Sequence, residues 1–148
     1  MKNAKIMLIE DQLIPAYDLR RQLNDMGYEV VAIFTKAETA LTYLEENKGT
    51  ETSPDVVIMD ISLAGKMDGV EASHIIIEKY DCEVIFLTGL LEIKVVEEIL
   101  RTRPVFFLIK PFDIYYTHIC IQMAIHQRTL EREIIQLKEE LKKFTGQQ

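Results

Sequence analysis

The sequence contains no tryptophan, only two cysteines and no long apolar run. Cys82 and Cys120 provide neither a disulfide framework nor the ligand set of a zinc site. The apolar runs are much shorter than the roughly 20 residues of a membrane-spanning helix. Near the N-terminus, Glu10 interrupts the first apolar run before the core of a signal peptide could form. We therefore expect a soluble, cytoplasmic domain with no membrane partner.

Basic side chains are also scarce relative to acidic ones. Lysine and arginine total 17 against 24 aspartates and glutamates, which gives a formal net charge of −7. An acidic chain is attracted weakly to phosphate backbones, so we expect no direct nucleic-acid partner. The 148 residues, of which 48% are hydrophobic, suffice for one domain with one hydrophobic core.

Five short apolar runs alternate with helical patterns along the chain. The runs are typical of strands buried on both faces, and they cover residues 6–9, 28–34, 56–59, 84–87 and 105–109. Because parallel strands need long crossover connections, the alternation predicts an α/β fold with a doubly wound, five-stranded parallel sheet.

Helix signals lie between these runs. Pro15 suits a first helical turn and Gly27 a helix end, and Thr35 with Glu38 matches a capping box. A third helix is expected from Asp68 or Gly69 to about Tyr80. A fourth is expected over residues 92–101, after which Pro104 prevents continuation.

Charged and polar residues follow the predicted strands directly. They are Glu10 and Asp11 after the first strand, Asp60 after the third, Thr88 after the fourth and Lys110 after the fifth. In an open parallel sheet the carboxyl ends of the strands share one edge, where ligands bind. The sequence therefore predicts three carboxylates, one hydroxyl and one amine in a single crevice.

Three neighbouring carboxylates repel one another unless a cation neutralises them. Oxygen ligands with positions left for water favour Mg²⁺ over zinc or copper. A divalent cation, a lysine and a threonine beside a carboxylate are the groups needed to transfer a phosphoryl group onto that carboxylate.

The sequence resembles the receiver domains of two-component response regulators over about residues 4–125. The matching segments follow the predicted strands in order: Ile9-Glu10-Asp11, Val57-Ile58-Met59-Asp60-Ile61, Asp68-Gly69, Leu87-Thr88-Gly89 and Lys110-Pro111-Phe112. The resemblance implies a flavodoxin-like strand order of 2-1-3-4-5, for which receiver proteins are a standard example.

The resemblance also implies roles for individual residues. Asp60 matches the phosphoacceptor, and Lys110, whose bond to Pro111 is expected to be cis, matches the essential amine. Thr88 and Phe107 match the two switch positions. The implied magnesium ligands are Glu10, Asp11, Asp60 and the backbone carbonyl of Ser62.

The sequence departs from the family pattern at four places. Glu10 replaces the more common aspartate, and residues 61–67 lack the frequent Met-Pro pair and are one residue longer. Phe107 lacks the hydroxyl of a tyrosine, so a switch there would act by packing alone. Leu90, two residues after Thr88, is apolar at a position that influences phosphoryl lifetime in the family.

Each of these residues also has an ordinary structural interpretation. Asp60 could be a turn residue, and Glu10 and Asp11 could cap the first helix. Asp11 could also cap that helix while it serves as a metal ligand. Thr88 could begin a helix, Lys110 could be a solvated strand end and Phe107 could belong to the core. Only their convergence at one edge favours a functional site.

The C-terminal segment has no helix breaker from Asp113 to Phe144. Apolar residues follow a 3-4 spacing, with heptad d positions at Tyr116, Met123, Leu130, Leu137 and Phe144 and a positions at Cys120, Ile134 and Leu141. Gln127 is the one polar a residue and could fix the register. This pattern favours a parallel two-stranded coiled coil, with Glu133 facing Lys138 of a second chain.

We expect a receiver domain over residues 1–125 and a helical extension over 126–148, which forms a homodimer. The alternatives are an amphipathic helix that frays in water and a signalling helix that leads to an output domain.

Three functions are compatible with these features. The first is a phosphorylation-dependent signalling switch, which accepts a phosphoryl group from a sensor histidine kinase or phosphotransfer protein and loses it slowly by its own hydrolysis. The second is a dimerisation or docking module that has the receiver fold without phosphoryl transfer. The third is a phosphohydrolase, which is disfavoured because Ser62 stands where such enzymes usually carry a second aspartate.

Overall fold

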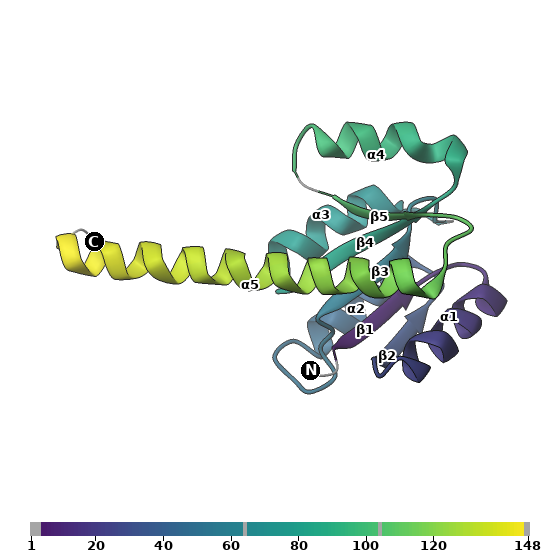
Figure 1. Ribbon diagram of the computed structural model, residues 1–148, viewed down its shortest axis with the longest axis horizontal. Coiled ribbons are helices and arrows are strands. Elements are labelled where there is room, and N and C mark those ends of the chain that lie inside the picture. Colours follow the sequence, from purple (N-terminus) through teal and green to yellow (C-terminus); the bar gives the residue numbers. More distant parts are fainter. Residues whose placement is uncertain (1–3, 64, 104, 147–148) are drawn as a thin grey trace.

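A computed structural model describes residues 4–63, 65–103 and 105–146 (Figure 1). Its sheet contains five parallel strands in the order β2-β1-β3-β4-β5. The strands are β1 (Lys5–Ile9), β2 (Glu29–Phe34), β3 (Val56–Asp60), β4 (Glu83–Thr88) and β5 (Phe106–Ile109). This topology confirms the predicted doubly wound α/β fold.

Helices cover both faces of the sheet (Figure 1). They are α1 (Leu13–Asp25), α2 (Ala37–Glu46), α3 (Gly69–Lys79), α4 (Ile93–Leu100), which follows a 3-10 turn at Leu90–Glu92, and α5 (Ile114–Thr145). One core packs α2, α3 and α4 against the sheet, and the other packs α1 and α5 against its opposite face.

The two cores explain the apolar composition of the strands. Side chains alternate across a strand, so Met7 and Ile9 enter one core while Ile6 and Leu8 enter the other. All residues of β3 and β4 are buried. Asp60 and Thr88, the last residues of β3 and β4, are therefore held at the carboxyl edge of the sheet.

Two predicted helix caps are wrong. Helix α2 has Lys36 at its N-cap with no side-chain hydrogen bond, so Thr35 and Glu38 form no capping box. Instead, the Glu38 carboxylate accepts a hydrogen bond of 2.9 Å from the backbone N–H of Met67. Helix α1 has Gln12 at its N-cap and no side-chain cap, so Asp11 does not cap it. At Glu38 this long-range contact outweighed the local signal.

Helix α5 extends far beyond the sheet, as the long C-terminal helix in Figure 1 shows. Asp113 caps its start by accepting a hydrogen bond of 2.9 Å from the Tyr116 N–H, and the helix contains 32 residues. At 1.5 Å per residue, that is about 48 Å. Its buried residues are Thr117, Ile121 and Ala124, all in the first half.

No helix in the described ranges meets the length and apolarity that a bilayer crossing requires. The predicted stop at Pro104 lies outside the described residues.

Candidate functional site

The carboxyl ends of β1, β3 and β5 bring Glu10, Asp60 and Lys110 into direct contact. One carboxylate oxygen from each of Glu10, Asp11 and Asp60 lies within 4.8 Å of the other two. Glu10 and Asp60 are each only 5% exposed, whereas Asp11 is on the surface. The sheet therefore converts residues that are distant in sequence into one acidic cluster.

Asp60 is held on both of its carboxylate oxygens. Its Oδ2 accepts a hydrogen bond of 2.7 Å from Lys110 Nζ, and its Oδ1 accepts bonds of 2.9 and 3.1 Å from the N–H and Oγ of Ser62. Burial acts to raise the pKa of Asp60, but the hydrogen bonds from Lys110 and the Ser62 amide outweigh it. The pKa of Asp60 therefore lies below its ordinary value, and Asp60 is an ionised, oriented carboxylate at neutral pH.

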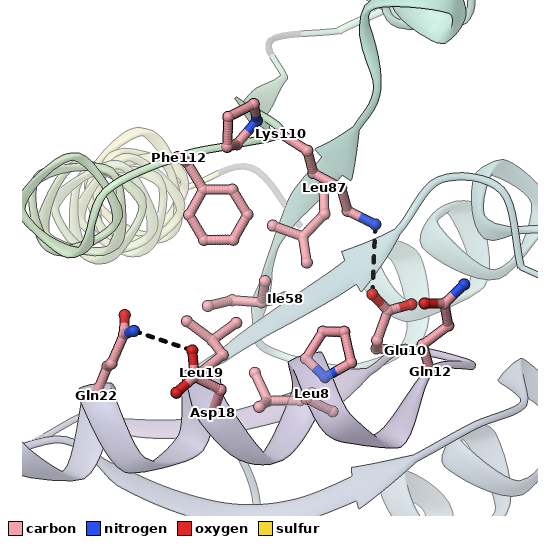
Figure 2. Close-up of a pocket in the computed structure, with 13 residues that line it drawn as sticks. Leu8, Glu10, Gln12, Asp18, Leu19, Gln22, Ile58, Leu87, Lys110 and Phe112 are labelled. Carbon is pink, nitrogen blue, oxygen red and sulfur yellow. Dashed lines mark hydrogen bonds and ion pairs between the residues drawn. The ribbon is translucent and has the colours of Figure 1, made fainter.

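The Glu10 carboxylate accepts fewer hydrogen bonds than the Asp60 carboxylate. Lys110 Nζ lies 3.3 Å from Glu10 Oε1, while Glu10 Oε2 is buried with no hydrogen-bond partner among the described residues. Burial and the adjacent Asp60 carboxylate raise the pKa of Glu10 to about 7. Figure 2 shows the Glu10 carboxylate directed toward the Lys110 amine.

The acidic cluster fits a hard divalent cation. Its donors are carboxylate oxygens, and the orphaned Glu10 Oε2 is a buried acceptor that a cation would satisfy. Glu10, Asp11 and Asp60 match three of the four ligands that the sequence predicts. The role of the Ser62 carbonyl as fourth ligand stays a prediction, because only the Ser62 N–H and hydroxyl have defined contacts in the site.

The structure defines two properties of Lys110, the geometry of its peptide bond and the charge of its amine. The Lys110-Pro111 peptide bond is cis, as predicted. Burial acts to lower the pKa of Lys110, but Asp60 and Glu10 outweigh it and raise that pKa. The amine is therefore a fixed positive charge between the two buried carboxylates.

The two predicted switch residues lie outside this hydrogen-bond network. Thr88 is fully buried, and its hydroxyl donates a hydrogen bond of 3.0 Å to the backbone carbonyl oxygen of Gly89. Phe107 is half-buried and packs against the core that contains α2, α3 and α4. Their switch roles stay predictions, because a single conformation does not test them.

Two residues, Gly69 and Glu38, make contacts near the site that were not predicted. Gly69 begins α3 so close to the end of β3 that an added Cβ would lie 2.7 Å from the backbone oxygen of Asp60. Glu38 secures the segment between β3 and α3 through Met67, as described above; Ala64 of this segment lies outside the described residues. The Asp68-Gly69 pair was visible in the sequence, but the close backbone approach was not.

A cavity of about 360 Å³ adjoins the acidic cluster between α1 and the segment after β5 (Figure 2). Its base is apolar, with Leu19, Ile58 and Phe112 facing it, and Glu10 and Lys110 lie at its rim. Two residues of the site, Glu10 and Lys110, therefore border a partly apolar pocket.

A doubly wound parallel sheet with an acidic, lysine-containing cluster at its carboxyl edge defines the class of this domain. The family model for the response regulator receiver domain matches residues 6–119, and the chain belongs to that family. Membership supports a role in signalling.

Curated relatives include two regulatory proteins. The chain is 28% identical over 141 residues to the transcriptional regulatory protein PdtaR of Mycobacterium tuberculosis, covering 93% of this chain and 66% of that protein. It is 29% identical over 109 residues to the phyllosphere-induced regulator PhyR of Methylorubrum extorquens, covering 74% and 39% of the two chains. The chain thus spans less than two thirds of the length of these relatives.

Solved structures show the same fold. The signal receiver domain of a modulated diguanylate cyclase from Desulfovibrio desulfuricans superposes with a TM-score of 0.77 at 30% identity, covering 88% of this chain and 99% of that one. The response regulator PhyR from Brucella abortus gives a TM-score of 0.73 at 29% identity, covering 88% and 51%.

Proposed function

We propose that the chain is a phosphorylation-dependent signalling switch whose phosphoacceptor is Asp60. The donor is the phosphohistidine of a sensor histidine kinase or a phosphotransfer protein. The observation that carries this proposal is the arrangement of Asp60, which is buried, ionised and held by Lys110 beside Glu10 and Asp11.

The transfer is a single displacement at phosphorus. One Asp60 carboxylate oxygen forms a bond to phosphorus as the nitrogen–phosphorus bond of the donor breaks, and the departing imidazole takes up a proton. The hydrogen bonds from Lys110 and Ser62 hold the carboxylate in place before the donor arrives. Such preorganisation lowers the barrier by removing the entropic cost of alignment.

Glu10, Asp11, Asp60 and the Ser62 carbonyl would hold Mg²⁺ in this site. When bound, the cation supplies positive charge that offsets the charge on the phosphoryl oxygens. Phosphorylation adds up to about one negative charge beyond that of the Asp60 carboxylate. Lys110, already at 2.7 Å from Asp60, offsets part of that charge.

Thr88 would convert the added charge into a change of surface. Its hydroxyl now donates to the Gly89 carbonyl, and rotation toward the phosphoryl group would release that bond at the start of the 3-10 turn before α4. Phe107, which packs on the same side of the sheet as α4, would then repack. We expect the altered surface to comprise α4, β5 and α5, with slow self-catalysed hydrolysis to reset it.

Intact-mass measurement tests this proposal. Incubation with Mg²⁺ and a small phosphoryl donor should add one phosphoryl group to the wild-type chain and none to Asp60→Asn. Asp25→Asn, an exposed acid on the last turn of α1, is the matched control and should be phosphorylated normally. A wild-type chain that gains no mass with an active donor would contradict the proposal, as would a gain in Asp60→Asn.

We also propose that the helical extension pairs two copies of the chain in parallel. Most seam residues of α5 are exposed, with Tyr116 67%, Met123 56%, Leu137 63% and Phe144 90% accessible, whereas Cys120 and Gln127 are half-buried. Isolated helix of this kind has nothing to bury in a monomer. A second copy would cover this stripe, and Glu133 of one chain would face Lys138 of the other.

A further inference from the structure

A second polar cavity, of about 520 Å³, lies at the amino edge of the sheet, opposite the acidic cluster. It is bounded by the segment between α2 and β3, by the end of α3, and by the part of α5 that leaves the domain. Figure 1 shows this segment as the large loop near the N-terminus, on the side toward which α5 extends. We refer to this cavity as the basal groove.

The basal groove concentrates positive charge in an acidic protein. Its lining includes five cationic side chains, two of them from α5, against two acidic ones, Asp55 and Asp81. The whole chain has a net charge of −7. The five cations are Lys5, Lys48, Lys79, Arg128 and Arg132. Like charges gathered in this way repel one another unless anions neutralise them.

Internal carboxylates neutralise only part of this charge. Arg128 pairs with Asp55 at 3.1 Å and with Asp81 at 3.2 Å, and Arg132 also pairs with Asp81. Lys79 pairs with Glu45 at 3.0 Å. The groove thus contains a fixed, ion-paired wall on the α5 side.

Two of the cations form no ion pair with a carboxylate in residues 4–63, 65–103 and 105–146. Lys5 Nζ instead donates to the backbone carbonyl of Glu51, a neutral acceptor. Lys48 Nζ and Lys79 Nζ each lie 5.7 Å from the centre of the Tyr80 ring. A negative ligand between these amines would therefore gain charge–charge interactions that the protein itself does not supply.

We propose that the basal groove binds a small phosphorylated anion with at least two negative charges. Lys5 and Lys48 would contact its phosphoryl oxygens, and Lys79, Arg128 and Arg132 would add a positive field. The Ser53 side chain also lines the groove and supplies a hydroxyl donor. Because Arg128 and Arg132 belong to α5, the bound anion would connect the base of the helical extension to the sheet.

Calorimetric titration of the full chain with inorganic pyrophosphate, in chelator and without Mg²⁺, tests this site. We expect saturable binding that weakens at least tenfold in a Lys5→Gln, Lys48→Gln double variant. Lys94→Gln, which removes an exposed lysine of α4 outside the groove, should leave the affinity unchanged. Asp60→Asn should also leave it unchanged, which separates this site from the acidic cluster.

A variant with the opposite expected effect guards against simple loss of folding. Asp81→Asn removes an acid from the groove and frees Arg132, so it should tighten pyrophosphate binding several-fold. Absence of binding to the wild type would overturn the proposal, as would equal weakening by Lys94→Gln. Binding of an oligonucleotide but not of pyrophosphate would overturn it too, because it would assign the groove to a nucleic acid.

Discussion

Lys110 interacts with two carboxylates whose pKa values move in opposite directions. Its amine lies 2.7 Å from Asp60 and 3.3 Å from Glu10, and the shorter bond goes to the proposed phosphoacceptor. Burial and the Asp60 charge leave Glu10 with a pKa of about 7, whereas the pKa of Asp60 is lowered. The site therefore contains one carboxylate that is ready to react and a second that a cation would stabilise.

Thr88→Ala should separate phosphorylation from its conformational consequence. Among the described residues the buried hydroxyl bonds to the Gly89 carbonyl alone, so its loss should cost about 1 kcal/mol of stability and leave the Asp60 contacts intact. We expect normal phosphoryl mass gain but no change in amide chemical shifts along α4 and β5. Thr88→Ser should restore those changes. A normal response in Thr88→Ala would exclude the hydroxyl as the switch.

Gly69→Ala should destabilise the protein and disturb the segment around Asp60, the proposed phosphoacceptor. The added Cβ would meet the backbone oxygen of Asp60 at 2.7 Å and that of Ile61 at 3.0 Å. Overpacking against backbone typically costs about 1–3 kcal/mol, which a urea midpoint would measure. In Gly89→Ala the added atom meets only the flexible end of Glu92, so that control should lose less. Equal losses in the two variants would contradict this account of Gly69.

At the scale of elements, the sequence predicted the strands and the convergence of Glu10, Asp11, Asp60 and Lys110 because both depend on simple rules. Buried parallel strands read as apolar runs, and the residue after each run is placed at the carboxyl edge. The helix caps were less predictable, because Glu38 reaches Met67 across 29 positions instead of its own N-cap. Gly69 illustrates the same limit: only the folded chain shows which backbone approaches it.

The contact between β4 and α5 should make stability depend on pH. Burial and the nearby Glu131 carboxylate raise the pKa of Glu83 to about 7, although Arg128 and Arg103 oppose the shift. The folded chain therefore binds this proton more tightly than the unfolded chain, whose glutamates titrate near pH 4.3. This contribution is complete at low pH and is lost as pH rises toward 7.

Glu83→Gln should accordingly stabilise the protein at pH 8 by about 1–3 kcal/mol and have little effect at pH 4.5. Urea unfolding at the two pH values measures the difference. Glu97→Gln, on the exposed side of α4, is the control and should show no such pH dependence. A gain in Glu83→Gln that is equal at both pH values would show that ionisation of Glu83 is not its cause.

At the scale of the whole molecule, α5 joins the receiver fold to a long exposed stripe. The exposed residues of its second half include Leu130, Ile134, Leu137, Leu141 and Phe144. The ion pairs of Arg128 and Arg132 with Asp81 connect the start of this half to the segment between α3 and β4. The proposed division at residue 125 therefore falls before these contacts, and the extension is continuous with the domain.

Sedimentation of a Leu137→Asp, Leu141→Asp variant tests the proposed pairing. Each substitution would place an aspartate of one chain against the same aspartate of the other in the buried seam. A wild-type dimer should therefore become a monomer. Ile135→Asp alters an equally exposed apolar residue outside the seam and should stay dimeric. A monomeric wild type would contradict the pairing. A dimer unaffected by phosphorylation would instead favour a docking module.

The central claim is that Asp60 carries the phosphoryl group, and chemical trapping tests it most directly. Borohydride reduces an acyl phosphate to an alcohol, so a phosphorylated aspartate becomes homoserine in the peptide that contains it. After treatment with a phosphoryl donor and Mg²⁺, we predict homoserine at position 60 and at no other aspartate. Homoserine at another position, or a stoichiometric phosphoryl gain with Asp60 unmodified, would contradict the account.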